Sequence, residues 1–287
     1  MSPEMPSYIK EFIEIAGKKS EQFSQGCDNL VDYQILQENL DSVVQAINNG
    51  RNVVLVTNHQ SYFEIETQRY FCQLLNKQLN GELHSYLLYS SPAVAHNIGQ
   101  LLDLRNKTYL DSGLNLLGVI RSSDLNHSIY SQNITDKMRI DSSVNNRKFF
   151  NAVRGEGNLI ICPFEKTLEG GRLDETGKIK GIQAVDEDSC LSVFINCNCL
   201  LLPCGIDGSY KIIDPKTHLP SKELVTSILS PSLSPKEKMV TFKLGNLIDP
   251  ASLRDLGLTP KDITHKTIVH VASLLSPEAQ GVYATAA

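Results

Sequence analysis

The sequence has no apolar run long enough to cross a lipid bilayer. Its longest runs, such as 52–57 and 199–206, are far below the roughly 18 to 20 residues that a membrane-spanning helix needs. The first residues also lack the basic start and the apolar block of a secretory signal. We therefore expect a soluble, cytoplasmic protein, and a transient contact with a membrane surface stays open.

Proline and glycine are scarce, and basic residues are not in excess. The 12 Pro and 18 Gly among 287 residues exclude collagenous and low-complexity classes, and 41% hydrophobic residues are typical of a globular protein. Acidic residues outnumber basic ones, 32 to 27, which disfavours nucleic acid as a partner. The seven cysteines form an odd number in mostly apolar surroundings, which favours reduced thiols over a disulfide framework.

The character of the chain changes near Gly50. Before it, apolar residues recur at helical spacing, which predicts a small N-terminal helical subdomain over residues 1–48. Residues 49–287 are predicted to form an α/β domain in which strands alternate with crossover helices. Each strand is hydrophobic almost throughout, so we expect a mostly parallel or mixed sheet covered by helices on both faces. The predicted strands are 53–57, 84–89, 116–121, 158–163, 200–206 and 240–247, and the main predicted helices are 62–79, 143–153 and 261–275.

Residues 53–64 contain the first candidate catalytic residues. His59 follows a buried strand directly, and Glu64 lies five positions later in the first turn of a predicted helix. A carboxylate at this spacing can orient an imidazole and stabilise its protonated form, so that the pair acts as a general base with its partner. The same segment fits a capping box, Ser61-x-x-Glu64, in which both side chains bond the first amides of the helix. The spacing alone favours neither interpretation.

Three later segments could supply binding groups. The third predicted strand ends in Arg121, whose guanidinium suits a phosphate or carboxylate, although strand-end arginines are more often surface residues. The fourth leads to Gly170, Gly171 and Arg172, where the backbone can approach a ligand closely or only make a turn. The last segment, 201–209, is predicted to be a buried strand ending in a turn, and by itself it indicates little about function. Ligands gather at the carboxyl ends of strands in such sheets.

The order of these segments is more specific than any one of them. Asn-His-x-Ser-x-x-acid, then Gly-Val-Ile-Arg, then a proline-containing strand leading to Glu-Gly-Gly-Arg, then Leu-Pro-Cys-Gly-Ile resembles the four blocks of the glycerolipid acyltransferase superfamily across residues 30–210. The details are most similar to the soluble, plastidial-type glycerol-3-phosphate acyltransferases. The sequence departs from that family in several places: Glu64 stands where its members have Asp, the third block carries extra residues before Gly170, a second arginine after Gly-Gly-Arg is missing, and the helical N-terminal region is shorter.

The resemblance implies an acyl transfer of phospholipid biosynthesis. His59 would deprotonate an acceptor hydroxyl, which attacks the thioester of an acyl-carrier protein or of coenzyme A, and Glu64 would orient His59. Arg121 and Arg172, with Gly170 and Gly171, would bind the acceptor phosphate. Lys137 and Arg139 are weaker candidates for the same role. No metal and no redox cofactor is required, and the cysteines at 197, 199 and 204 lack the usual spacing of a zinc site.

Three functions remain open from the sequence. The first is acyl transfer to glycerol 3-phosphate. The second is the same chemistry on a lysophospholipid such as 1-acylglycerol 3-phosphate. The third is a catalytically weakened module that binds lipid or carrier. It is supported only by Glu64 in place of the family's Asp and by the altered third block.

Overall fold

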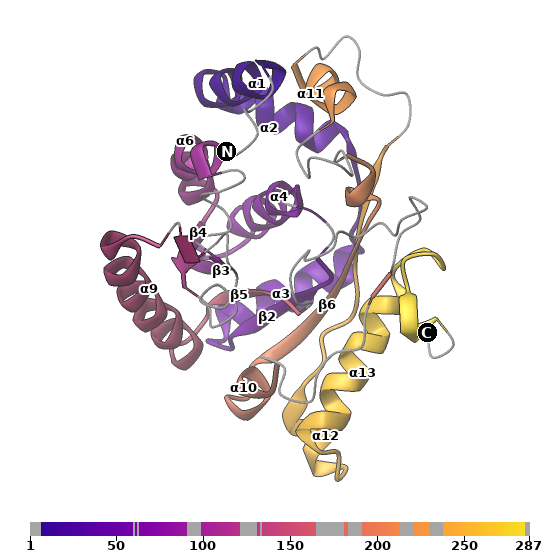
Figure 1. Ribbon diagram of the computed structural model, residues 1–287. Helices are drawn as coiled ribbons and strands as arrows, with labels where there is room; N and C mark the ends of the chain where they lie inside the picture. The colour runs from indigo at the N-terminus through magenta and orange to yellow at the C-terminus, as the bar shows by residue number, and fades with distance from the viewer. Residues whose placement is uncertain are drawn as a thin grey trace.

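The seven strands of the described residues form one mixed sheet in the order β1-β7-β6-β2-β5-β3-β4 (Figure 1). The computed structural model describes residues 7–59, 61, 63–90, 99–120, 131–132, 134–164, 181–182, 191–212, 221–229 and 238–284. Strand β7 runs antiparallel to β6, whereas β6, β2, β5, β3 and β4 all run parallel, so these five end at the same edge of the sheet. The strands are β1 Val31–Gln34, β2 Val53–Thr57, β3 Ser85–Ser90, β4 Leu114–Val119, β5 Leu159–Pro163, β6 Leu200–Asp207 and β7 Val240–Leu244.

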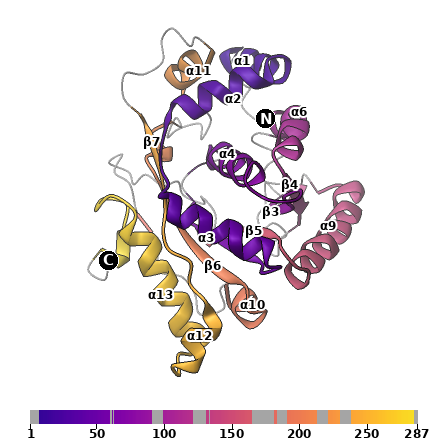
Figure 2. The ribbon, with the colours of Figure 1, turned by 180° about the vertical axis from the view of Figure 1, so that it is seen from behind.

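Helices cover both faces of the sheet, and strand β2 shows why. All five of its residues are buried, and they alternate between two cores: Val53 and Leu55 face one cluster, Val54 and Val56 the other. Figures 1 and 2 show α4 and α13 on opposite sides of β6. The first face packs against α1 Ser7–Lys18, α2 Ser20–Asn29, α3 Gln37–Asn48, α4 Glu64–Asn76, α6 Gly99–Asp111 and α11 Lys222–Leu229. The second packs against α9 Asp136–Arg154, α10 Leu191–Asn196 and α13 Pro260–Ser273, with α12 Pro250–Asp255 at its border.

The α/β fold and the six predicted strands are confirmed, with ends that shift by up to three residues. One strand was not predicted: β1 lies inside the segment expected to be a helical subdomain, and it pairs in parallel with β7. This strand is short and only Val31 is fully buried in it, so its sequence carries little hydrophobic signal. Helix α9 begins at Asp136, seven residues before the predicted start. Within the described parts of the chain, no helix is long and apolar enough to span a membrane.

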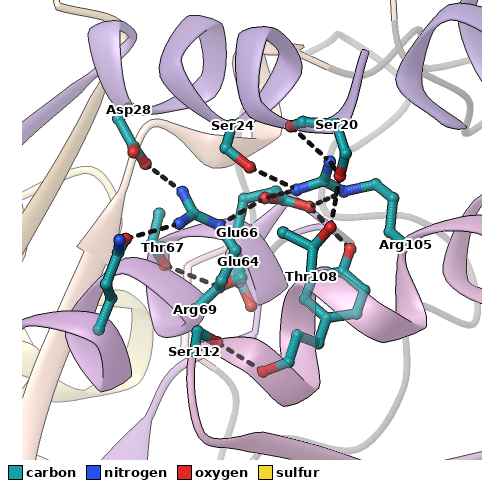
Figure 3. Close-up of polar contacts among 12 residues, drawn as sticks. Ser20, Ser24, Asp28, Glu64, Glu66, Thr67, Arg69, Arg105, Thr108 and Ser112 are labelled. Atoms are coloured by element: carbon teal, nitrogen blue, oxygen red, sulfur yellow. Dashed lines mark hydrogen bonds and ion pairs between the residues drawn. The ribbon is translucent and has the colours of Figure 1, made fainter. Parts of the chain in front are cut away.

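A buried group of charged side chains joins α4 to α2 and α6 (Figure 3). Glu66, in the first turn of α4, accepts hydrogen bonds from both neighbouring arginines. Arg105 of α6 donates to Glu66 Oε1 at 2.9 Å and to Oε2 at 2.8 Å, and Arg69 Nε donates to Oε2 at 3.0 Å. Arg69 reaches Asp28 of α2 at 2.6 Å. The network therefore ties α2, α4 and α6 together beneath the surface.

The two arginines decide the charge state of Glu66. Burial by itself raises the pKa of a carboxyl, but the nearby guanidinium groups of Arg105 and Arg69 outweigh this effect and hold the pKa of Glu66 below its usual value. Tyr109 adds a hydrogen bond to Glu66 Oε1 at 2.7 Å. Arg105 has no exposed side-chain surface and stacks over Phe23 at 4.3 Å. Glu66 is thus an ionised carboxylate whose stability depends on buried cations.

Replacing Arg105 with Ala should lower the free energy of unfolding by about 3 to 5 kcal/mol, because the substitution leaves Glu66 short of its main partner in a buried site. Denaturant titration of both proteins measures the difference. Lys18→Ala is the control, since the ion pair of Lys18 with Glu14 lies on the exposed face of α1 and should contribute little. Equal midpoints for the Arg105 variant and the control would contradict the structural role of the network.

Candidate functional site

The site begins where β2 ends, at Asn58. Its side-chain amide lies fully buried between β2 and β6. Asn58 Nδ2 donates to the Ile206 carbonyl at 2.8 Å, and the Ile206 amide donates to Asn58 Oδ1 at 2.8 Å. Because backbone pairing of the two strands extends to Thr57 and Cys204, this side chain continues the pairing one step further. The backbone on the N-terminal side of His59 is therefore held against β6.

His59 and Glu64 are in direct contact at this edge of the sheet. The distance between His59 Nδ1 and Glu64 Oε2 is 2.7 Å. The imidazole keeps 22% of its surface exposed, whereas the Glu64 side chain is 2% exposed. A carboxylate on Nδ1 favours the tautomer with the proton on that nitrogen, which directs the basic lone pair to Nε2. The spacing predicted by the sequence thus gives a pair with the geometry of a base and its orienting partner.

Glu64 also takes part in the start of helix α4. Its Oε1 accepts a hydrogen bond from the Ser61 backbone amide at 2.9 Å, which is one arm of a capping box. The Ser61 hydroxyl accepts from the Phe63 amide at 3.2 Å, whereas the Glu64 amide donates to the Ser61 backbone carbonyl at 3.5 Å. The two interpretations of this segment are therefore compatible, because each uses a different carboxylate oxygen of Glu64.

A third element contributes Ser209, which the sequence did not single out. Ser209 begins the short 3₁₀ helix η1, Ser209–Ile212, directly after β6. Its hydroxyl donates to Glu64 Oε1 at 2.9 Å. The turn before it needs glycine, since Gly208 has φ +83° and a Cβ there would lie 2.3 Å from the Met239 carbonyl oxygen. Only the Asp-Gly-Ser turn at a strand end could have indicated this contact.

Two buried thiols of the β6 segment are not suited to act as nucleophiles: Cys204 near the site, and Cys199 just before β6 at the opposite edge of the sheet. Cys204 of β6 is buried, and this burial, together with the negative charge of Glu64, raises the pKa of its thiol well above the usual value. Burial raises the pKa of Cys199 to about 11. Both therefore stay protonated at neutral pH. Across the residues with a described structure, no three His, Cys, Asp or Glu side chains form a group that could hold a metal ion.

The other predicted site residues divide into two groups. Lys137 and Arg139 lie exposed in the first turn of α9, and the Lys137 ammonium group is 2.6 Å from Asp141 Oδ2. Helix α9 follows β4 in the chain, and their predicted role in binding the acceptor stays a prediction. Outside the described residues lie Arg121, Gly170, Gly171 and Arg172.

The strands before those residues end at the same edge as β2. Strand β4 stops at Val119, two residues before Arg121, and β5 stops at Pro163, upstream of the Gly-Gly-Arg segment. Phe164 is held to the end of β2 by its amide, which donates to the Thr57 carbonyl at 3.1 Å. The four segments singled out in the sequence therefore all leave the sheet at one edge.

A scan against protein-family models gives no match for this chain, and a comparison with curated proteins finds no similar sequence. The site therefore has to be interpreted from its own residues and geometry.

Asn58→Ala should lower the free energy of unfolding by about 2 kcal/mol or more, because it leaves the buried amide and carbonyl of Ile206 without their partners. Asn58→Asp keeps the acceptor for the Ile206 amide but loses the donor to its carbonyl, so it should also destabilise. Thermal or denaturant unfolding measures both. Ser143→Ala, on the exposed side of α9, is a control. An Asn58 variant as stable as this control would refute the role of Asn58 in holding the end of β2 against β6.

Proposed function

We propose that the protein is an acyltransferase that moves a fatty acyl group from a thioester to a hydroxyl group of glycerol 3-phosphate. The donor would be an acyl-carrier protein or acyl coenzyme A. The observation that carries the proposal is the 2.7 Å contact between His59 Nδ1 and Glu64 Oε2 at the carboxyl edge of the parallel strands. It coincides with the segment in which the sequence resembles the first block of the glycerolipid acyltransferases.

The pair can perform the proton transfers of this reaction. His59 Nε2 takes the proton from the acceptor hydroxyl as its oxygen attacks the thioester carbonyl. The carbon–sulfur bond then breaks, and the imidazolium returns the proton to the leaving thiolate. Glu64 stabilises the imidazolium while it exists, because its carboxylate stays on Nδ1 throughout. An ester and a free thiol result, with no net change in the protonation of His59.

The longer side chain of Glu64 does not separate it from His59. An Asp at this position would be one methylene shorter, and the helix start positions Glu64 so that its carboxylate still reaches the ring. The intact contact favours an enzyme over a weakened binding module. Because the His59 ring is partly exposed, it can exchange a proton with a substrate, whereas the buried Glu64 cannot reach one.

The sequence resemblance implies that Arg121 and Arg172 bind the acceptor phosphate, with Gly170 and Gly171 beside Arg172. Guanidinium groups suit this task because they bind phosphate oxygens in a bidentate manner. Lys137 and Arg139, which are exposed in the first turn of α9, stay weaker candidates for the same role.

An acyl-transfer assay with separate donors and acceptors tests the proposal. Purified protein would be given acyl coenzyme A or an acyl-carrier protein, each with glycerol 3-phosphate or 1-acylglycerol 3-phosphate, and the acylated product would be measured. The proposal expects product with glycerol 3-phosphate. Product with 1-acylglycerol 3-phosphate alone would assign the lysophospholipid reaction, and binding of donor without any product would assign a binding module.

His59→Ala should lower kcat by about 10²- to 10⁴-fold, the usual contribution of a general base. The protein should stay folded, because His59 is partly exposed and belongs to neither hydrophobic core. Turnover and thermal unfolding are measured on the same sample. His84→Ala removes an exposed imidazole elsewhere and should leave kcat unchanged. Full turnover by the folded His59 variant would exclude the mechanism.

Glu64→Gln separates the two roles of Glu64. The Gln side chain can keep an oxygen acceptor for the Ser61 amide but loses the charge that stabilises the imidazolium. We expect kcat to fall by roughly 10²-fold or more with little change in melting temperature. Glu64→Ala should lower both. If Glu64→Gln retains wild-type kcat while Glu64→Ala unfolds early, Glu64 serves the helix start only.

A further inference from the structure

Ser209 touches the same carboxylate that touches His59, from the opposite oxygen. Its hydroxyl lies 2.9 Å from Glu64 Oε1, whereas His59 Nδ1 lies 2.7 Å from Glu64 Oε2. The two contacting side chains come from points 150 positions apart in the chain, after neighbouring strands β2 and β6. Ser209 has no exposed surface. The hydrogen bond is thus buried and shielded from competing water.

The surrounding chain holds the Ser209 hydroxyl in place. The Lys211 amide donates to the Gly208 carbonyl at 2.9 Å, which closes the turn around Ser209. Tyr210 and Ile212, on either side of Lys211, are buried. The φ of +83° at Gly208 sets the direction of the chain into this turn. Because the turn is anchored on both sides, the serine cannot move away from Glu64 without disturbing the end of β6.

Rotation about the last carbon–carbon bond of Glu64 moves both carboxylate oxygens together, so fixing Oε1 also sets the position of Oε2. The Ser61 amide and the Ser209 hydroxyl approach Oε1 from two different elements, the start of α4 and the end of β6. Two donors on one oxygen define the carboxylate plane better than a single donor does. They leave Oε2 directed at His59 Nδ1.

We propose, on the basis of the acyl transfer proposed above, that Ser209 is a positioning residue for that reaction. It acts through Glu64 and does not touch the substrate. Its hydroxyl fixes the rotation of the Glu64 carboxylate, which in turn fixes the ring and the tautomer of His59. The end of β6 is in this way part of the reaction centre.

Ser209→Ala should lower kcat roughly 10-fold or more, since small misplacements of a catalytic group cost rate steeply, and leave KM for donor and acceptor unchanged. Ser209→Thr keeps a hydroxyl and should restore much of the rate. Ser112→Ala is the matched control: Ser112 is also a buried serine, and its hydroxyl donates to the Tyr109 carbonyl, away from the pair. A Ser209→Ala variant that behaves like this control would overturn the proposal.

A double-mutant cycle shows whether Ser209 acts through Glu64. In the Glu64→Gln background, Ser209→Ala should change kcat by less than about 2-fold, because the group that it positions has already lost its charge. If Ser209→Ala lowers kcat by the same factor in both backgrounds, Ser209 acts independently of Glu64 and the proposal is wrong.

The positioning can also be measured without turnover, by ¹⁵N nuclear magnetic resonance of the His59 ring. We expect the wild-type protein to hold the proton on Nδ1, and Ser209→Ala to shift the tautomer populations of His59 while Ser112→Ala does not. Unchanged His59 resonances in Ser209→Ala would overturn the inference. Absence of acyl transfer by the wild-type protein, with the expected shift of His59, would instead refute the proposed function and leave the role of Ser209 at Glu64 intact.

Discussion

The Glu66 carboxylate is the group on which the arrangement of the site helix depends. It is buried in the first turn of α4, where only ionic and hydrogen-bonded partners make a charge tolerable. Arg69 of the same helix and Arg105 of α6 supply those partners, and Arg69 extends the contact to Asp28 of α2. Because removal of either guanidinium would leave a buried charge without a partner, the network holds α4 in one position relative to α2 and α6.

Glu64 and Glu66, two residues apart on α4, have different partners. Consecutive helical residues are separated by 100°, so Glu64 and Glu66 face opposite sides of α4. Glu64 faces the strand ends and meets His59 and Ser209, whereas Glu66 faces α6 and meets two arginines. The charged network fixes the rotation of α4 about its own axis. That rotation brings Glu64 to the imidazole, which connects the N-terminal helices to the site although they contribute no side chain to the pair.

The sequence predicts what depends on local pattern, and the structure adds what depends on distant partners. Buried strands such as β2 could be predicted because they are apolar almost throughout, and the His59–Glu64 pair because its members lie five positions apart. Strand β1 was missed because four residues with mixed polarity carry no clear period. Ser209 and Arg105 could not be assigned, since their partners lie 145 and 39 positions away. A serine after a strand and an arginine in a helix have no signal of their own.

The shared use of Glu64 links the orientation of His59 to the order of the helix start. One oxygen of this carboxylate satisfies the backbone at the start of α4, and the other holds the His59 ring. Helix ends fray more readily than helix centres, and local opening requires less free energy than global unfolding. In α4 this turn also carries Ile65 of the first core and the Glu66 carboxylate, so fraying that released the imidazole would disturb that core and the charged network as well. Loss of the His59–Glu64 contact on heating should therefore accompany the separation of α4 from the sheet and should not precede it.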